Sequence, residues 1–196
     1  MDITILAGGR GTRLKGIWDR PKCLVPYQGR PLIEHLVDRA LELKPRKVFL
    51  LLGHKAWEVV QWREHCCPHR DVVPIIETEP KGTAAAVRNA LPLMKPPLLV
   101  LNGDTLPCYN LLSEFVIAFD DGTGRTIAAW ADGVPAGASL FGAYKMSSIG
   151  ASCANDLTDF IYGTDVKHVS VSGFIDAGTP KGLKQLRRYK FCTPLV

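Results

Sequence analysis

The sequence predicts an α/β fold built on a mostly parallel central sheet, and two observations carry this prediction. First, short continuous apolar runs, typical of buried parallel strands, occur at residues 3–6, 48–52 and 98–101 of the 196-residue chain. Second, segments with apolar residues at helical spacing lie between these runs. The clearest, at 31–43, places on one face Leu32, Ile33, Leu36, Val37, Ala40 and Leu41. Strands joined through helices in this way pair in parallel, by right-handed crossovers.

The other elements follow in chain order. Up to residue 122 we expect helices at 55–64, 83–91 and 111–119, and a strand at 72–76 despite Pro74. Beyond residue 122 we expect strands at 125–130 and 139–146, a short helix at 157–162 and an extended pair at 166–175, broken near Gly173. Thr179 and Pro180 suit the N-cap and first position of a last helix, which ends near residue 189. We therefore expect one domain, 1–196, with a regular half at 1–122 and a smaller mixed half at 123–196.

Composition narrows the function classes. Hydrophobic residues make up 46% and charged residues 22% of the chain, as in ordinary globular proteins with a buried core. The net charge of +5 comes without a dense run of Lys and Arg, so it favours phosphate ligands over a nucleic-acid partner. No apolar run suits a membrane span or a signal peptide, and the six cysteines form no CxxC pair. We therefore expect a cytoplasmic protein with free thiols and with neither a nucleic acid nor a membrane as partner.

Three polar segments each follow an expected strand. The first is the glycine-rich run AGGRGTR at 7–13, the second is Asn-Gly-Asp at 102–104, and the third is Asp-Ala-Gly-Thr at 176–179. Ligands of open α/β sheets bind outside the carboxyl ends of the strands, where all three segments would lie. We therefore expect the three segments to converge on one site.

The first segment suits a phosphate. Gly8, Gly9 and Gly11 permit backbone conformations that form an anion nest of N–H groups. Arg13 can grip a phosphate with two donors, and Lys22 adds a compact positive charge. A glycine-rich loop alone also fits a plain turn, so the prediction depends on the combination.

Two aspartates at strand ends suit a metal ion. A Mg²⁺ that bridges a triphosphate needs one or two carboxylates, with phosphate and water oxygens completing its shell. Asp104 and Asp176 could supply them. A strand-end aspartate can also cap a helix, but Thr179 is the better placed cap beside Asp176.

These segments carry a resemblance. The run LAGGRGTRLKGIWDRPK at 6–22 resembles the signature (L/F)AGGxGTRLxPxTxxxPK of the sugar-1-phosphate nucleotidyltransferases. GTAAAVRNAL at 82–91 is similar to the second loop of that family, VLNGDTL at 100–106 to its metal-binding motif, and FIDAGTP at 174–180 to its late D-x-G-T-P motif. The four motifs occur in family order over nearly the whole chain. The short length and the lysine spacing are most similar to the compact branch that includes D-glycero-D-manno-heptose 1-phosphate guanylyltransferases.

The resemblance implies a fold and a reaction. The fold would be the three-layer α/β/α Rossmann-like type of the nucleotide-diphospho-sugar transferases, with nucleotide bound by the first half and sugar phosphate and metal by the second. The reaction would join a nucleoside triphosphate and a sugar 1-phosphate into an NDP-sugar, with release of pyrophosphate. Arg13 would hold the departing pyrophosphate and Lys22 the α-phosphate and the sugar phosphate. The sugar phosphate is itself a competent nucleophile, so no general base is expected.

The resemblance also implies a set of site residues. The catalytic group would be Arg13, Lys22 and Asp104, and Mg²⁺ (or Mn²⁺) would bind Asp104 and Asp176. The nucleotide would bind Leu6, Ala7, Gly8, Gly9, Arg10, Gly11, Thr12, Arg13, Lys22, Glu77, Gly82, Thr83, Asn102, Gly103 and Asp104. The sugar phosphate would bind Lys22, Gly142, Tyr144 and Asp176.

Glu77 bears on the choice of base. Several members of the family have a glutamine five residues before the second-loop glycine, where it pairs with uracil or thymine; here that position is Glu77. A carboxylate only accepts hydrogen bonds, and guanine offers two adjacent donors where uracil offers one. The sequence therefore favours GTP. Glu79 could play the same part, and a solvated Glu77 at a strand end is the alternative.

The sugar and the activity leave alternatives open. The segment that contacts the sugar in most relatives is shortened here, at 126–142, so the substrate is small or loosely held, or a partner subunit of a homo-oligomer completes the site. Uridylyl, thymidylyl or cytidylyl transfer to another sugar phosphate stays open, as does a non-catalytic regulatory subunit, although the charged residues are retained. The GTRL and D-x-G-T-P motifs argue against a molybdenum-cofactor guanylyltransferase.

Overall fold

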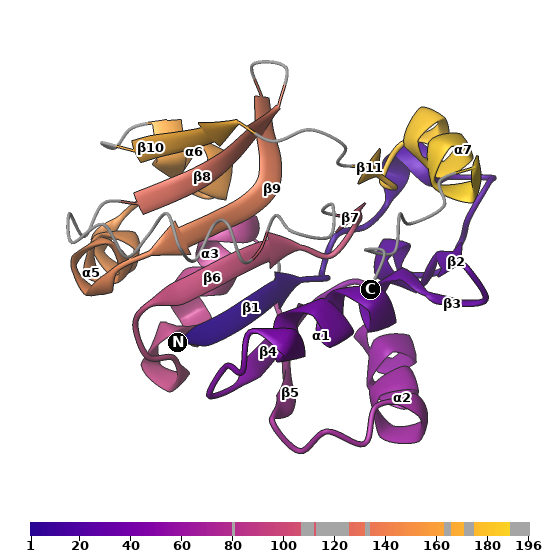
Figure 1. The fold of residues 1–196 in the computed structure, drawn as a ribbon, viewed down its shortest axis with the longest axis horizontal. Helices are drawn as coiled ribbons and strands as arrows, with labels where there is room; N and C mark the ends of the chain where they lie inside the picture. The colour runs from indigo at the N-terminus through magenta and orange to yellow at the C-terminus, as the bar shows by residue number, and fades with distance from the viewer. Residues whose placement is uncertain are drawn as a thin grey trace, which may run out of the picture.

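A seven-stranded mixed sheet forms the centre of the protein (Figure 1). The computed structural model describes residues 1–79, 81–106, 112, 126–131, 134–162, 166–170 and 175–188. The strand order of the sheet is β10-β8-β9-β6-β1-β4-β5. Its strands are β1 (Asp2–Leu6), β4 (Val48–Leu52), β5 (Val72–Ile76), β6 (Leu98–Asn102), β8 (Thr126–Ala131), β9 (Val134–Phe141) and β10 (Val166–Ser170). Only β9 runs antiparallel to its neighbours, so the prediction of a mostly parallel mixed sheet is confirmed.

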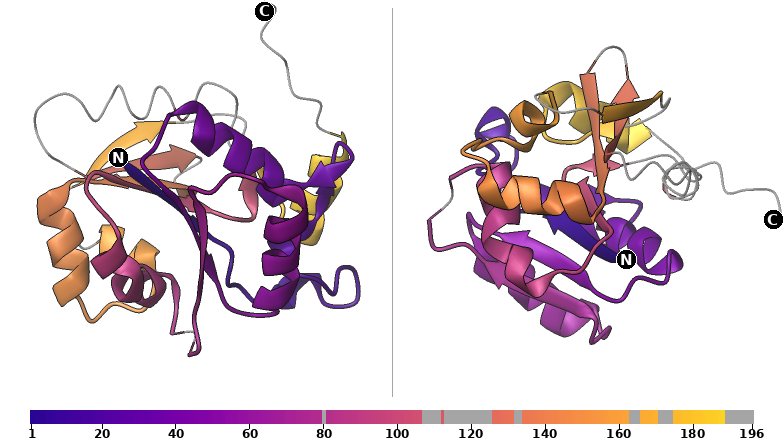
Figure 2. Two further views of the ribbon diagram at one scale, coloured as in Figure 1. Left: turned by 90° about the horizontal axis from the view of Figure 1, so that it is seen from below. Right: turned by 90° about the vertical axis from the view of Figure 1, so that its left-hand side faces the viewer.

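Helices cover both faces of this sheet (Figure 2). On one face lie α1 (Leu32–Glu42) and α2 (Ala56–Cys66), and on the other α3 (Thr83–Ala90), α5 (Ala143–Ala151) and α6 (Leu157–Tyr162). Successive strand residues point to opposite faces. Leu50 and Leu52 therefore pack under α1 and α2, while Phe49 and Leu51 pack under α3. The molecule thus has the three layers that the sequence predicted.

The central strands end in register. Leu6 of β1 pairs with Leu51 on one side and with Asn102 on the other, so the polar segments that follow β1 and β6 leave the sheet side by side. In Figure 1 these strands point toward the side that carries β7, β11 and α7. Pro74 is tolerated because β5 is an edge strand of the sheet.

A third apolar cluster lies beyond the carboxyl ends of the strands. Helix α7 (Pro180–Arg188) packs Leu183 and Leu186 against Leu14 and Leu106. The hydroxyl of Thr179 accepts the Gly182 N–H at 3.0 Å, which confirms the predicted N-cap. Beside this helix lie two small antiparallel sheets, formed by β7 (Thr105–Leu106) with β11 (Ile175–Asp176) and by β2 (Pro26–Tyr27) with β3 (Arg30–Pro31). The cluster therefore joins residues 14–32 to Leu106 and to residues 175–186.

Two predictions for the second half are wrong. The strand expected at 139–146 ends at Phe141, and helix α5 begins at Ala143, because the apolar residues Met146 and Ile149 recur at helical spacing and pack on α3. The extended segments of 166–175 do not pair with each other, since β10 pairs with β8 and β11 with β7. The helix expected at 111–119 and the end of the last helix lie largely outside the described residues.

The described residues bear on two further expectations. Four cysteines, Cys23, Cys66, Cys67 and Cys153, are free thiols, as expected. Across the described ranges, no helix combines the length and the apolar character needed to cross a membrane.

Candidate active site

A pocket of about 480 Å³ opens at the carboxyl ends of β1, β4, β5 and β6. The three polar segments converge there, as predicted from the sequence. Its lining residues are Leu6, Ala7, Gly8, Gly9, Arg10, Arg13, Lys22, Cys23, Leu51, Glu77, Gly82, Thr83, Ala86, Asn102, Gly103, Asp104, Thr105, Gly137, Asp156 and Asp176. Of the residues predicted from the sequence, four do not line it: Gly11, Thr12, Gly142 and Tyr144.

The glycine-rich loop is folded closely against its surroundings. A Cβ on Gly8 would stand 3.0 Å from the backbone nitrogen of Gly53, so a side chain there would push the loop off the next strand end. Gly11 has a φ of 65°, in the left-handed region, and a Cβ there would stand 3.0 Å from Cγ of Lys22. Gly11 therefore shapes the loop so that it lies along the lysine side chain, without facing the pocket itself.

Strand pairing brings the two aspartates together. Asp176 of β11 lies opposite Thr105 of β7, and the Ala177 N–H donates to the Asp104 carbonyl at 2.7 Å. A Cβ placed on Gly178 would stand 2.6 Å from Oδ2 of Asp104 and 2.9 Å from Oδ1 of Asp176. The two carboxylates therefore converge on one point, and only a glycine leaves that point open.

Two of the cations that line the pocket, Lys22 and Arg13, each face one of these carboxylates. Lys22 forms an ion pair with Asp104 through Nζ and Oδ2, and the two side chains are only 18% and 17% exposed. Arg13 lies farther out: its Nη1 is 3.9 Å from Oδ2 of Asp176, with side-chain exposures of 62% and 36%. The inner cation is therefore held tightly, whereas the outer one is loosely held and open to a ligand.

The aspartate pair fits a hard divalent cation. Carboxylate oxygens are the ligands that Mg²⁺ and Mn²⁺ prefer, and two of them converge here. Within the described ranges no group of three or more His, Cys, Asp or Glu residues could hold a metal alone. Asp104 and Asp176 therefore suit a cation whose remaining ligands come from phosphate and water.

Glu77 lies at the opposite end of the pocket. Its N–H donates to the Leu52 carbonyl at 2.7 Å, which continues the pairing of β5 with β4. Its Oε2 lies 3.4 Å from the Cβ position of Gly8, and its Oε1 is buried without a hydrogen-bond partner in the described structure. Burial raises the pKa of this carboxyl. The interpretation of Glu77 as a solvated strand-end residue is therefore wrong.

Glu79 is placed differently. Its carboxylate lies 3.1 Å from Nζ of Lys81, and both side chains are exposed. It does not line the pocket. Of the two glutamates that the sequence offered, the structure thus brings only Glu77 to the site.

Gly82 and Thr83 bring in an aspartate that sequence reasoning missed. Gly82 has a φ of 104°, and any side chain there would collide with the Asn155 carbonyl. That carbonyl accepts the N–H of the second α3 residue at 2.9 Å, and the Thr83 hydroxyl accepts the Leu157 N–H at 2.8 Å. The starts of α3 and α6 are thereby joined, which places Asp156 in the pocket. Nothing local in the sequence signals this long-range contact.

The predicted sugar contacts at Gly142 and Tyr144 are not at the pocket. Gly142 is the N-cap of α5 rather than part of a strand, and the Tyr144 side chain is 78% exposed on that helix. Thr105 and Gly137 line the pocket instead, with the Cβ position of Gly137 2.9 Å from Oγ1 of Thr105. Thr105 directly follows the Asn-Gly-Asp motif, a position that could have been included from the sequence.

The geometry defines an α/β protein with a pocket at its strand ends, lined by a glycine-rich loop, cations and carboxylates. The model of the MobA-like NTP transferase domain matches residues 3–163, so the chain belongs to that family. The match confirms the nucleotidyltransferase family predicted from the motifs. It ends before Asp176, whose place in the site is given by the pairing of β11 with β7.

Curated relatives cover only part of the chain. The bifunctional protein GlmU of Burkholderia orbicola (strain MC0-3) is 40% identical over 125 residues, and that of Cellvibrio japonicus (strain Ueda107) is 40% identical over 106 residues. These alignments cover 62% and 53% of this chain and 26% and 22% of the relatives. The chain thus spans about a quarter of the length of the relatives it matches.

Solved structures share the fold over nearly the whole chain. HddC from Yersinia pseudotuberculosis superposes with a TM-score of 0.78 at 24% identity, covering 94% of this chain and 97% of that one. HddC complexed with GMP-PN superposes with a TM-score of 0.76 at 24% identity, with 95% and 98% covered. A putative glucose-1-phosphate thymidylyltransferase from Bacillus anthracis, in complex with a sucrose, gives 0.79 at 17% identity, with 98% and 97% covered. At these identities the likeness establishes the fold.

Proposed function

We propose that this protein is a sugar-1-phosphate guanylyltransferase, which converts GTP and a sugar 1-phosphate into a GDP-sugar and pyrophosphate. One observation carries the proposal. A single pocket holds Arg13, Lys22 and two convergent carboxylates at one end, and at the other the carboxylate of Glu77, whose Oε1 is buried without a partner in the described structure. The first end suits a triphosphate, and the second suits a base that donates hydrogen bonds.

The two cations can divide the phosphates between them. Lys22 lies inside the pocket, where it can hold the α-phosphate and the incoming sugar phosphate close together. Arg13, at the exposed rim, can grip the β- and γ-phosphates that leave as pyrophosphate. The backbone N–H groups of the glycine-rich loop add partial positive charge beside them. This arrangement favours in-line attack of the sugar phosphate oxygen on the α-phosphorus, with cleavage between the α- and β-phosphates.

Asp104 and Asp176 would hold Mg²⁺ or Mn²⁺ in this reaction. When bound, the divalent ion would neutralise charge on the phosphoryl oxygens and orient them. The protein's own contribution is to fix both carboxylates on one point, with Gly178 keeping that point open.

Glu77 supports guanine as the base. Guanine presents N1–H and the 2-amino group side by side, and one carboxylate can accept both hydrogen bonds. The buried Oε1 has no partner in the described structure, and a donating base would supply one. The likeness to HddC, of which one structure holds GMP-PN, is consistent with this choice.

The sugar 1-phosphate is the second substrate of the proposed reaction. The compact sequence and the likeness to HddC make D-glycero-D-manno-heptose 1-phosphate the first candidate. Asp156 and Thr105 line the pocket and offer oxygen atoms that can accept hydrogen bonds from sugar hydroxyls.

A pyrophosphate-release assay tests the proposal. GTP, CTP, UTP, dTTP and ATP would each be combined with a panel of sugar 1-phosphates, with Mg²⁺ and with EDTA. We expect the fastest release with GTP and a heptose or hexose 1-phosphate, and none with EDTA. Release with UTP, dTTP or CTP alone would replace the guanylyl assignment. No release with any pair would favour a regulatory subunit, and release that survives EDTA would contradict the metal site.

A further inference from the structure

The segment between the turns of Arg13 and Lys22 is packed through Trp18 and Pro21, while its other residues are exposed. Arg13 and Lys22 belong to two short 3-10 turns, Thr12–Leu14 and Lys22–Leu24, and residues 15–21 connect them. We call this segment the connector. Gly16 has open space around its Cβ position, and Ile17 is 54% exposed. Asp19 and Arg20, which are exposed just before Lys22, therefore depend on contacts outside the connector for their position.

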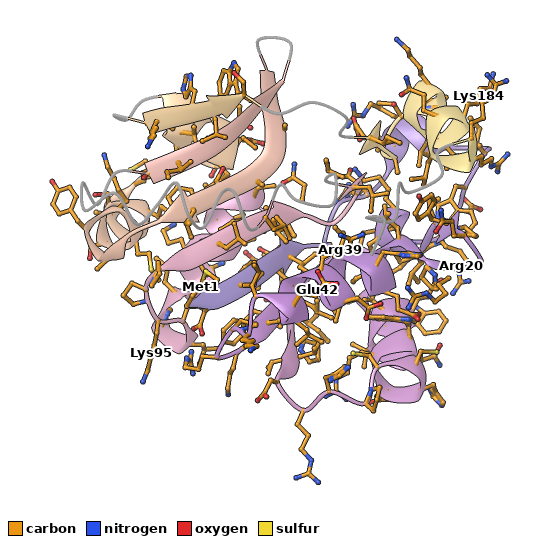
Figure 3. All side chains as sticks on the ribbon, in the orientation of Figure 1. Met1, Arg20, Arg39, Glu42, Lys95 and Lys184 are labelled. Atoms are coloured by element: carbon orange, nitrogen blue, oxygen red, sulfur yellow. The ribbon has the colours of Figure 1, made fainter. Side chains whose placement is uncertain are left out.

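The start of helix α2 supplies that support. Nε of Arg20 donates to Oε2 of Glu58 at 2.6 Å, and Nζ of Lys55 donates to the Asp19 carbonyl. Glu58 is nearly buried, with a side chain 10% exposed, while Arg20 covers it from the solvent side at 57% exposure. Figure 3 shows Arg20 on the side of the molecule that carries α2 and α7, away from Met1 and Lys95. Two consecutive connector residues are thus held by one helical turn.

The helix start is itself built for this contact. Lys55 has a φ of 53°, a left-handed conformation that is costly for a residue with a side chain. The bond from its ammonium to Asp19 helps to hold it there. Glu58 is the third residue of α2, where a carboxylate is stabilised by the free N–H groups and the dipole of the helix. Helix α2 can therefore stay folded without Arg20.

A short and rigid link connects Arg20 to Lys22. The residue between them is Pro21, whose ring fixes its φ. The Pro21 carbonyl accepts the Trp18 Nε1–H at 3.0 Å and the Leu24 N–H at 2.9 Å. A shift of Arg20 therefore moves Lys22 and its ammonium group, which is directed at Asp104.

We propose that Glu58 and Arg20 are positioning residues that set the reach of Lys22 into the active site. The inference rests on the proposed function, in which Lys22 brings the attacking phosphate to the α-phosphate. Neither residue lines the pocket, so neither would touch a substrate. Their effect should fall on kcat more than on the binding of GTP, because Glu77 and Arg13 would hold the two ends of GTP.

Steady-state kinetics of Arg20→Met, Glu58→Gln and the double variant test this proposal. We expect kcat to fall about tenfold in each single variant, with the KM for GTP within about twofold, because small misplacements of a catalytic group are costly. The double variant should be no slower than the slower single variant, since the two residues would act as one unit. Arg20→Lys should recover part of kcat, because a lysine can still pair with Glu58.

Controls separate positioning from stability. Arg30→Met removes a comparable ion pair, that of Arg30 with Glu34 and Asp38 on α1, and should leave kcat unchanged. Circular dichroism at the assay temperature would measure the folded fraction of each variant. A wild-type kcat in both single variants, or a loss of activity that follows the loss of folded protein, would overturn the positioning role. A wild-type protein that releases no pyrophosphate with any pair would instead overturn the proposed function, and this inference with it.

Discussion

Lys22 and Asp104 form an ion pair inside the pocket, and it joins the phosphate-directed cation to the carboxylate that suits a metal. Both side chains are mostly buried, so this pair is screened less than a surface pair. A metal ion on Asp104 must share that carboxylate with an ammonium group. A triphosphate would offer Lys22 other oxygens and release Asp104. Metal and triphosphate should therefore bind cooperatively, each favouring the other.

Lys22→Met tests this competition. Without the ammonium group, Asp104 is free for a cation, and we expect the affinity for Mn²⁺ in the absence of nucleotide to rise about tenfold, the equivalent of one charge-assisted hydrogen bond. The same variant should lose pyrophosphate release, since Lys22 would no longer hold the phosphates. Electron paramagnetic resonance of free Mn²⁺ measures the affinity. Lys15→Met is the matched control, and an unchanged Mn²⁺ affinity in Lys22→Met would refute the competition.

Gly178→Ala should block the site without unfolding the protein. The added Cβ would stand within 3.1 Å of Nζ of Lys22 and closer still to carboxylate oxygens of Asp104 and Asp176. All three contacts are to the ends of side chains, which can move aside at small cost to folding. The movement would separate the two carboxylates. We expect kcat to fall about 100-fold and Mn²⁺ binding to weaken, with a melting temperature close to that of the wild type.

Gly150→Ala is the matched control for Gly178→Ala. Gly150 lies in α5, where an added Cβ would meet only Leu91 Cδ1 at 3.6 Å, an ordinary contact. Within a helix, alanine is more stable than glycine by about 0.5–1 kcal/mol. The control should be as active as the wild type and slightly more stable. Activity in Gly178→Ala at the wild-type level would show that the point between the carboxylates is not used.

The first half of the fold could be predicted because its signals are local. Continuous apolar runs gave β1, β4 and β6, and the helical spacing of leucine and valine gave α1. In the second half the same local signals misled. The apolar residues of segment 139–146 predict one strand, but β9 ends at Phe141 and the chain turns into α5 at Gly142. Packing of α5 on α3 decides that change, and it comes from residues far away in the sequence.

The site, like the fold, has features that the sequence predicts and features that depend on long-range contacts. The convergence of the three motifs could be predicted because the carboxyl ends of parallel strands meet at one edge of a sheet. The presence of Asp156 in the pocket could not be predicted from the sequence, since it depends on the contact of Asn155 with the start of α3. Likewise, the pairing of Arg20 with Glu58 depends on where α2 is placed against the connector, which no motif encodes.

His35 should make folding stability sensitive to mild acid. It is buried in α1, with Nε2 2.9 Å from the Tyr27 carbonyl and Nδ1 3.4 Å from Arg30, so the neutral ring with a proton on Nε2 fits both partners. Burial lowers the pKa of His35 from its ordinary value of 6.5, and the charge of Arg30 acts in the same direction. The stabilising effect of the neutral ring is thus complete above pH 6.5 and is lost as the pH falls through the lower folded-state pKa.

His35→Gln tests this assignment. The variant loses a buried hydrogen-bonded ring, so we expect a free energy of unfolding about 1 kcal/mol lower than wild type at pH 8. The difference should narrow between pH 7 and pH 5, because only the wild type pays for protonation. Urea unfolding at a series of pH values measures this difference in the free energy of unfolding. His65→Gln, at an exposed position of α2, should run parallel to the wild type, and a constant offset for His35→Gln would exclude the histidine as the cause.

Glu77 should lower the stability of the free folded protein while serving to bind the base. Burial raises the pKa of its carboxyl, and its Oε1 has no partner in the described structure. Because the folded-state pKa lies above the unfolded value of 4.5, the folded protein prefers the protonated acid. Below about pH 4.5 the Glu77 carboxyl therefore does not reduce the stability of the folded protein. As the pH rises through the folded-state pKa, this carboxyl becomes charged and the folded protein loses stability. A bound guanine would offset this penalty by donating to the carboxylate.

Glu77→Gln separates the two effects. At pH 7 we expect the free variant to be more stable than the wild type, with the gain shrinking toward pH 4.5. The ratio of kcat/KM for GTP over UTP should fall at least about tenfold, because an amide can no longer accept both guanine donors. Glu79→Gln, at the exposed pair with Lys81, should change neither quantity. An unchanged ratio of GTP to UTP use would separate Glu77 from base recognition, even if the melting temperature rises as expected.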